Sequence, residues 1–276
     1  MNWFKLLLHD LRCGAFRVRY LIAALLVLIP CMGFLHSATL VEITPSWMDY
    51  LLMTFRGGVP VDPSNPTDIR SLPYDWLLMV GACLFVNLDY MLLDLTNNGQ
   101  QVIIRSQSRY GWFLSKCAWN LSASAIYFLL IGLVELVFAA VSGGIVSAEN
   151  TTESYMIIFG WVAFKPVQLS LQEGLILGLL LPYLTVAALS ILEMTLCLIV
   201  KPVLSFLICM ALLVLAVYVD SPFVLGNGAM TVRSSIIAAD GQNPLLVALV
   251  AVGTILVCII AGVVAFKNSD VLGSRE

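Results

Sequence analysis

The chain has 276 residues, of which 60% are hydrophobic and 11% are charged, and its formal net charge is −3. Soluble domains carry about a quarter charged residues, so this chain cannot cover a water-facing surface and needs lipid around much of it. The sequence has no basic patch or stripe of the kind that binds nucleic acid. Its seven cysteines lie in or beside apolar runs without a C-x-x-C pair, which argues against a disulfide framework or a thiolate metal site.

The first 19 residues form an amphipathic stretch. Phe4, Leu7 and Leu11 follow helical spacing on one face, while Lys5 and Arg12 lie on the opposite face. This pattern predicts a helix in the membrane interface with its cationic side toward the headgroups. Such a helix could be a simple membrane anchor, which this segment alone favours, or an elbow that braces a transport domain.

Six apolar runs are long enough to cross the hydrocarbon core as helices, which takes about 20 residues. They are 20–38, 74–93, 118–141, 174–200, 202–219 and 244–266. One helix over the fourth and fifth runs would be about 69 Å long, about twice the bilayer thickness. The chain should therefore turn at Lys201-Pro202, because lysine favours the interface and proline breaks a helix. We expect an all-α membrane protein in which residues 1–276 form one transmembrane domain.

The placement of lysine and arginine predicts the orientation. Ten of the fourteen lie on the side of the two termini and four on the other, and an excess of positive charge marks the cytoplasm. We therefore expect a multi-pass protein of the cell membrane with both termini cytoplasmic. The longest outer loop would be 39–73, within which 47–55 could form a short interfacial helix.

The polar segment 94–116, between the second and third runs, carries the clearest candidate for a partner contact. Its apolar patch, Val102, Ile103 and Ile104, is flanked by Arg105 and Arg109. A short exposed helix of this kind could dock into a groove on another protein. The alternative is a positively charged loop that only fixes the topology.

Four carboxylates lie within or at the ends of the apolar runs, where they are costly and are candidates for function. Asp89 and Glu193 lie toward the cytoplasmic end, Glu173 lies at the outer interface, and Glu135 lies in the outer third of the third run. Glu135 has no obvious basic partner, so it could make an interhelical hydrogen bond or face a water-filled cavity.

Sequence motifs for catalysis are missing. The chain has no phosphate-binding G-x-x-x-x-G-K-[ST] loop, no H-E-x-x-H and no G-x-S-x-G. With only His9 and His36, the chain has almost no histidines from which to build a metal site or a catalytic triad. An intramembrane enzyme is therefore the least favoured class.

The order of the segments resembles the permease subunits of type-2 ABC exporters, particularly those of Gram-positive bacteria whose ATPase is a separate polypeptide. The resemblance covers nearly the whole chain. It rests on Phe16-Arg-Val-Arg-Tyr20, Ser106-Gln-Ser-Arg-Tyr-Gly-Trp-Phe-Leu-Ser-Lys116, Lys201-Pro-Val-Leu-Ser-Phe206, the stretch 221–235 and Phe266-Lys-Asn-Ser-Asp-Val-Leu272.

The resemblance implies a permease that pairs with a second permease, identical or different, above two ABC ATPase subunits. ATP and Mg would bind to the ATPase and no cofactor to this chain, which would not be an enzyme by itself. The main ATPase-coupling residues would be Gln100, Val102, Ile103, Ile104, Arg105 and Arg109, and Lys201 would lie in a minor contact. Members of the family export peptides, antibiotics, lipid-linked glycans or drugs. The long loop 39–73 departs from many members and puts a transferred account of the outer gate in doubt.

An ATP-independent transporter or channel is the alternative. Such proteins often carry paired intramembrane charges or broken helices in matching halves. This sequence offers only the unpaired Glu135 and no internal repeat, which favours the exporter.

Overall fold

The computed structural model describes residues 3–12, 18–59, 72–88, 90–94, 109–144, 146–159 and 168–268. These residues form helices, turns and one isolated β-bridge, but no strand. The helices are α1 (Trp3–Asp10), α2 (Val18–Leu25), α3 (Leu28–Leu40), α4 (Trp47–Thr54), α5 (Tyr74–Asn87), α6 (Tyr90–Asp94), α8 (Arg109–Val141), α9 (Thr152–Phe159), α10 (Leu171–Leu175), η3 (Ile176–Leu180), α11 (Leu181–Leu196), α12 (Pro202–Tyr218), η4 (Asn227–Ala229), η5 (Thr231–Arg233) and α13 (Pro244–Asn268). The chain is therefore all-helical, as the sequence predicted.

Four helical stretches are long and apolar enough to cross a membrane: Val18–Leu40, Tyr110–Val141, Leu171–Leu196 and Pro244–Phe266. They contain or largely overlap the first, third, fourth and sixth apolar runs. The second and fifth runs form the shorter apolar helices α5 and α12. Their length and composition make the chain a multi-pass membrane protein.

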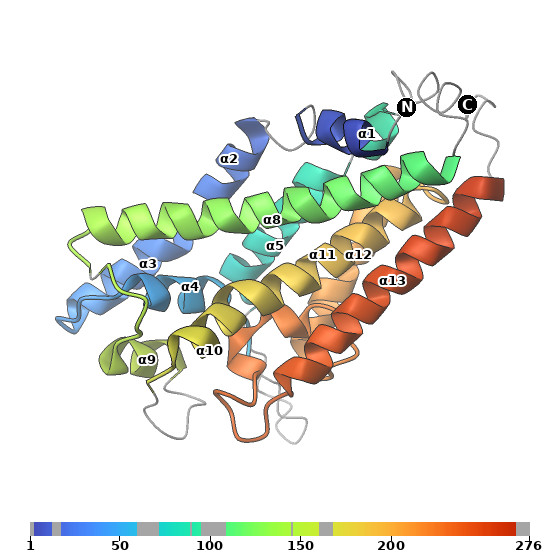
Figure 1. Ribbon diagram of the computed structural model, residues 1–276. Coiled ribbons are helices and arrows are strands. Elements are labelled where there is room, and N and C mark those ends of the chain that lie inside the picture. Colours follow the sequence, from blue (N-terminus) through green and yellow to red (C-terminus); the bar gives the residue numbers. More distant parts are fainter. Residues whose placement is uncertain are drawn as a thin grey trace.

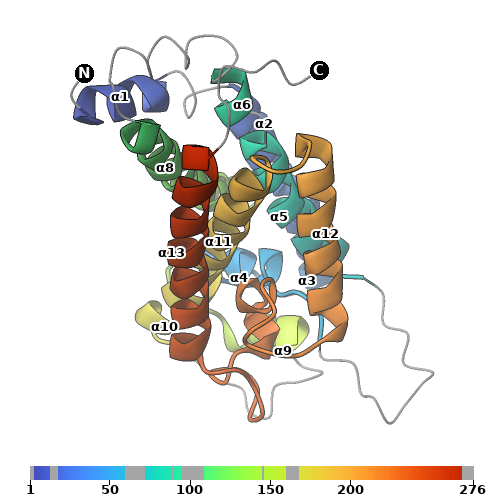
Figure 2. The same cartoon turned by 90° about the vertical axis from the view of Figure 1, so that its right-hand side faces the viewer.

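The helices form a bundle with two distinct ends (Figures 1 and 2). One end, called the α1 end, holds α1, α6, the start of α8 and the end of α13. The other, called the α9 end, holds α9, α10 and the segment with η4 and η5. Helix α11 is central, since it contacts α5, α8, α12 and α13 and most of its residues are buried.

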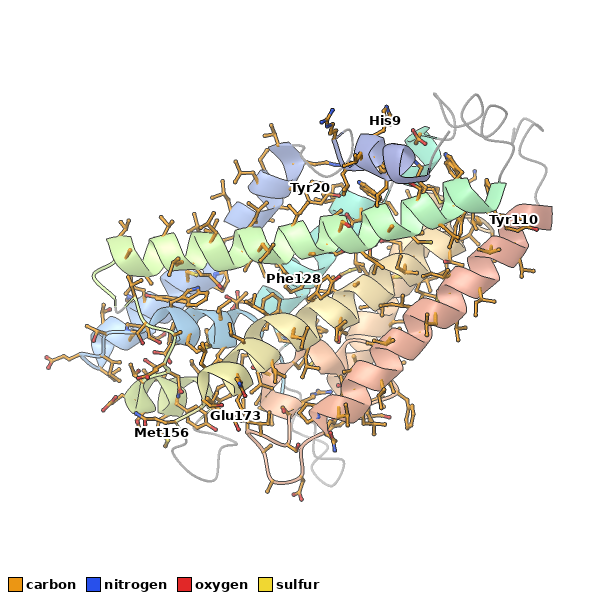
Figure 3. All side chains as sticks on the ribbon, in the orientation of Figure 1. His9, Tyr20, Tyr110, Phe128, Met156 and Glu173 are labelled. Atoms are coloured by element: carbon orange, nitrogen blue, oxygen red, sulfur yellow. The ribbon has the colours of Figure 1, made fainter. Side chains whose placement is uncertain are left out.

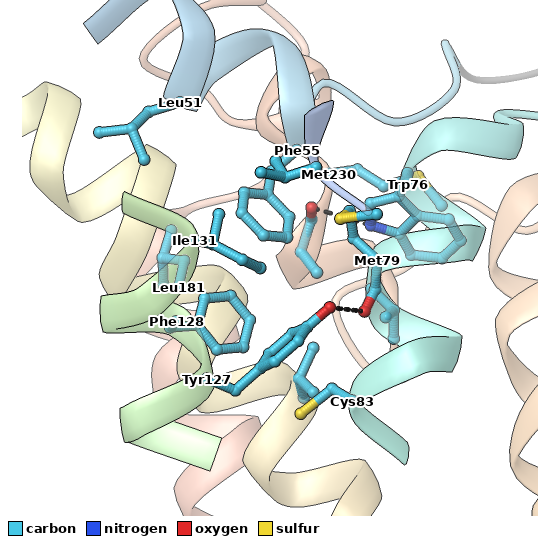
Figure 4. Packing of buried hydrophobic residues seen from close by; sticks show 14 of the residues in the cluster. Leu51, Phe55, Trp76, Met79, Cys83, Tyr127, Phe128, Ile131, Leu181 and Met230 are labelled. Carbon is cyan, nitrogen blue, oxygen red and sulfur yellow. Dashed lines mark hydrogen bonds between the residues drawn. The ribbon is translucent and has the colours of Figure 1, made fainter. Parts of the chain in front are cut away.

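Apolar packing joins α8 to its neighbours along its length. Tyr127 of α8 points toward Met79 of α5 in Figure 4, where its hydroxyl donates to the Met79 carbonyl at 2.9 Å. Phe128 of α8 stacks on Phe55 at the end of α4. On the outside of the bundle, large apolar side chains such as Leu256 are exposed. A lipid environment suits that surface.

Two boundaries differ from the sequence prediction and one is confirmed. Residues 109–116, assigned to a polar connecting segment, are the first two turns of α8. They stay helical because Trp112 and Phe113 are buried and stack on Phe266 of α13. The second apolar run breaks after α5, and α6 begins at Tyr90. The turn at Lys201-Pro202 is confirmed, since α11 ends before it and α12 begins at Pro202.

Helix α4 lies inside the bundle and not at the interface where we expected it. Its N-terminus is fixed by a capping box between Ser46 and Asp49, and it packs against α3, α8, α9 and η3. Met48 and Leu51 are buried against Gly174 and Gly178, where a side chain would collide with them or press on them. The prediction of an interfacial location was wrong because these glycines open a groove that can take the helix.

Candidate functional site

A buried ion cluster lies at the α1 end. Lys116 of α8 is fully buried, and its Nζ lies 2.5 Å from Asp10 Oδ1 of α1 and 2.7 Å from Asp94 Oδ2 of α6. Asp10 is also buried, whereas the Asp94 side chain is 13% exposed. We call these three residues the Lys116 cluster.

Neighbouring groups hold the two carboxylates in place. Ser115 Oγ donates to Asp10 Oδ2 at 2.6 Å, and Trp112 Nε1 donates to Asp94 Oδ2 at 3.2 Å. The Tyr90 hydroxyl donates to Asp10, and the Lys116 ammonium lies over the Tyr90 and Trp112 rings. A buried polar network with this many partners is rigid, and loss of any member leaves a costly unpaired group.

The cluster fixes the chain on both sides of residues 95–108. Helix α6 ends at Asp94 and α8 begins at Arg109, and Lys116 ties both helices to α1. A displacement of the intervening residues would therefore reach α1 and α8 together. Two carboxylates face one ammonium group, so replacement of the lysine by an uncharged residue would leave both carboxylates without this counter-charge.

The candidate coupling residues divide into two groups. Five of them lie outside the described residues: Gln100, Val102, Ile103, Ile104 and Arg105. The Arg109 side chain is not described, and Asp89, a candidate polar residue of the second run, also lies outside the described residues. Lys201 is exposed at the position that precedes α12, and α12 begins at the α1 end of the bundle (Figure 2). The structure therefore brings Lys201 to the end of the bundle where the chain leaves α6 and enters α8.

Sequence reasoning missed the Lys116 cluster. Asp94 and Lys116 are the first and last residues of the predicted polar segment, so their opposite charges at its two boundaries were a usable signal. Asp10 gave none, because a single carboxylate in an amphipathic stretch does not indicate a partner that is distant in sequence. In the structure, α1 turns Asp10 inward, while His9 is exposed (Figure 3).

A second polar centre joins four helices at the middle of the bundle. Asn87 of α5 accepts from the Tyr20 hydroxyl of α2 at 2.7 Å. Its amide donates to Ser124 of α8 at 3.1 Å and to Ser190 of α11 at 3.0 Å. Glu193 lies almost one turn further along α11 and is buried, and its Oε1 has no hydrogen-bond partner among the described residues.

Glu135 lies in α8 toward the α9 end and is fully buried. Thr54 Oγ1, at the end of α4, donates to Glu135 Oε1 at 2.5 Å. Within the described part of the chain, Glu135 Oε2 has no hydrogen-bond partner. Of the two roles expected from the sequence, this arrangement supplies the interhelical hydrogen bond. Glu173 stands apart: it is half-buried and forms the capping box at the start of α10 with Ser170.

A buried arginine holds the η4–η5 segment at the α9 end. Arg233 Nε donates to the Gly58 carbonyl at 2.9 Å, and its two terminal nitrogens donate to Ala216 at 2.5 Å and Val217 at 2.7 Å. These last two carbonyls belong to the final turn of α12, whose negative dipole end favours a cation. Burial lowers the pKa of Arg233 to about 10, while Asp220 acts in the opposite direction. The guanidinium remains charged at neutral pH and caps α12.

A metal centre is not evident in the described residues. No group of three or more histidines, cysteines, aspartates or glutamates there could hold a metal ion. A small pocket beside Arg233 is lined by residues including Leu177, Asn227 and Val247. The Lys116 cluster and the Glu135–Thr54 contact are therefore the two sites on which function can be argued.

The DUF2705 family, described as a protein of unknown function, matches residues 48–272. The matched range includes α4 from its second residue, Lys116 and Glu135, but not α1, so Asp10 lies outside it. No curated protein and no solved structure matches the chain.

Proposed function

This chain belongs to the DUF2705 family, and we propose that it is the membrane-spanning permease subunit of an ATP-driven exporter whose ATPase is a separate polypeptide. The observation that carries the proposal is the Lys116 cluster. It ties the chain on both sides of residues 95–108, the segment that carries the apolar patch Val102 to Ile104, to α1 and to the longest helix of the bundle.

We propose that all six apolar helices cross the membrane with both termini in the cytoplasm. Helix α12 has 17 residues and a length of about 26 Å, close to the hydrocarbon thickness of about 30 Å. The stretch from Tyr74 to Asp94 reaches a similar length through α5 and α6 together. Lys116 and Lys201 lie at the α1 end, which supports a cytoplasmic location for that end.

In this proposal, two ATPase subunits bind ATP and Mg and close on each other. Their closure presses on residues 95–108, with Lys201 in a minor contact. Because the Lys116 cluster is rigid, the displacement is passed on to α8 and α1. Two permeases, identical or different, would enclose the pathway for a peptide, an antibiotic or another amphipathic cargo. Rearrangement of this kind, driven by a partner's closure, is a known route to switching access.

Affinity purification of the chain in mild detergent tests the proposal directly. We expect an ATPase subunit that contains a phosphate-binding loop to be recovered in equal amount with the chain. If the chain is recovered from its native cells without an ATPase, and reconstituted vesicles gain no ATP-dependent transport, the exporter is the wrong class.

A transporter or channel that works without ATP is the second candidate. The buried carboxylates Glu135 and Glu193, each with an oxygen that lacks a partner among the described residues, favour it. The π-helix η3 within the fourth span does so as well, because such segments often lie at functional sites. Vesicles that contain this chain alone would then transport a solute when an ion gradient is applied across their membrane. An exporter without its ATPase would not.

A further inference from the structure

Helix α4 fills the bundle at the α9 end and is held at both of its ends. At its start, Trp47 Nε1 donates to the Gly132 carbonyl of α8 at 3.0 Å, and Asp49 accepts from the Thr151 hydroxyl at 3.1 Å. At its other end, the carbonyl of Phe55 accepts from Thr231 N at 2.8 Å and that of Arg56 accepts from Val232 N at 3.1 Å. These contacts close the space between α3, α8 and η3.

Glu135 faces this helix and no cation pairs with it in the described residues. Its immediate partner is Thr54, and Cys31 of α3 is close enough to interact with it electrostatically. The other titratable groups on the helices that pack there are His36 of α3, Asp49 and Tyr50 of α4, and Glu153 and Tyr155 of α9. His36 and Glu153 are exposed, and the next cation along the chain after α4, Arg56, interacts with Asp75. Among the described residues, the buried groups beside the carboxyl are therefore neutral or acidic.

A carboxyl group in these surroundings is far more stable as the neutral acid, because a buried charge without a counter-ion loses its hydration. Glu135 Oε1 already accepts from Thr54, so the proton belongs on Oε2, the oxygen without a partner among the described residues. Deprotonation would require water at the carboxylate. Movement of the α4 end that carries Thr54 away from α8 would open a path for that water.

We propose that Glu135 is a binding site for one exchangeable proton and that this proton holds α4 in the bundle. When α4 moves out, the Oε2–H bond breaks, the proton passes to an entering water molecule, and the electron pair stays on the carboxylate. When the proton returns, the carboxyl loses its need for hydration and α4 closes on it. The proposal goes beyond the exporter and does not depend on the source of energy.

The sign of the pH dependence follows from proton linkage. The closed form binds one proton more than the open form, so a lower pH favours closure. Where the open form is ionised, the ratio of open to closed forms rises about tenfold for each pH unit. Glu135→Gln is the matched variant, because its amide keeps an oxygen acceptor for Thr54 and has no proton to lose.

Infrared difference spectroscopy of the purified chain tests the proton itself. We expect the Glu135→Gln variant to lose the carbonyl stretch of a protonated carboxyl at neutral pH. Loss of a carboxylate band in its place would overturn the proposal, since it would show that Glu135 is ionised in the closed bundle.

Hydrogen exchange of the backbone amides of α4, with the chain in lipid nanodiscs, tests whether the Glu135 proton holds α4 in the bundle, which we call the proton lock. The ratio of the wild-type rate to the Glu135→Gln rate cancels the intrinsic pH dependence of exchange, and we expect this ratio to rise up to about tenfold per pH unit. Glu193→Gln, which changes the other buried glutamate, should keep the wild-type pH dependence in α4. A pH-independent ratio, or a ratio that responds to sodium and not to pH, would refute the proton lock.

Discussion

Replacement of Lys116 by methionine removes the one positive charge of the Lys116 cluster and keeps a side chain of similar length. Asp10 and Asp94 then remain close together, the first with a side chain 1% exposed and the second 13% exposed. Removal of one partner from a buried ion pair costs about 3–5 kcal/mol. We expect the lower value, about 3 kcal/mol, because Asp94 keeps some contact with solvent and because Ser115 and Trp112 still donate to the carboxylates.

Thermal unfolding in detergent, followed by circular dichroism, measures the effect. At about 2 °C of Tm for each kcal/mol in a chain of this size, Lys116→Met should lower Tm by about 6 °C. Lys201→Met is the matched control, because Lys201 is exposed and forms no ion pair within the described residues. Surface substitutions of this kind change stability by about 0.5 kcal/mol or less, which corresponds to about 1 °C.

A triple variant separates the charge from the shape. Lys116→Met combined with Asp10→Asn and Asp94→Asn leaves no buried charge, so most of the lost Tm should return. The reasoning fails if Lys116→Met lowers Tm no more than Lys201→Met does. It also fails if the triple variant is less stable than Lys116→Met, since the cost would then come from packing and not from unpaired charge.

Three further predictions concern partner, packing and topology. Ile103→Asp should release the ATPase during co-purification while the chain stays inserted in the membrane, because apolar anchors carry most of the free energy of such an interface. If the variant binds the ATPase normally, residues 94–108 serve only to fix the topology. Gly178→Leu should lower Tm, since a side chain there presses on α4 and overpacking costs about 1–3 kcal/mol, whereas Gly253→Leu, with open space around its Cα, should not. An impermeant thiol reagent should label Ser64→Cys but not Gln107→Cys on intact cells; the reverse pattern would contradict the orientation.

The sequence predicted the helices well because their formation depends on local properties. Apolar runs of about 20 residues become helices in any membrane; four of the six runs match long apolar helical stretches, and the other two contain the shorter helices α5 and α12. The break at Lys201-Pro202 was equally local, since proline and an interfacial lysine act on their own neighbours. A short helix at 47–55 could also be expected from the residues alone.

The location of α4 and the Lys116 cluster could not be predicted, because both depend on contacts distant in sequence. Thr54 and Glu135 are 81 residues apart, and Asp10 and Lys116 are 106 apart. No periodicity in the sequence specifies which helix faces which. The glycines that receive α4, Gly174 and Gly178, looked like ordinary residues of a membrane helix until their neighbours were known.

The two candidate sites lie on one helix, and this arrangement gives the bundle a way to connect them. Lys116 and Glu135 are 19 residues apart on α8, which corresponds to about 28 Å along its axis. Lys116 lies near the α1 end and Glu135 lies toward the α9 end. The other helices tied at the Lys116 cluster are interrupted: α5 and α6 by the break after Asn87, and α1 by its short length. Among these described helices, α8 alone is continuous across both sites. A displacement of Lys116 would therefore tilt or shift α8 as a rod, and that motion would reach α4 through the contacts of Thr54 with Glu135 and of Trp47 with Gly132.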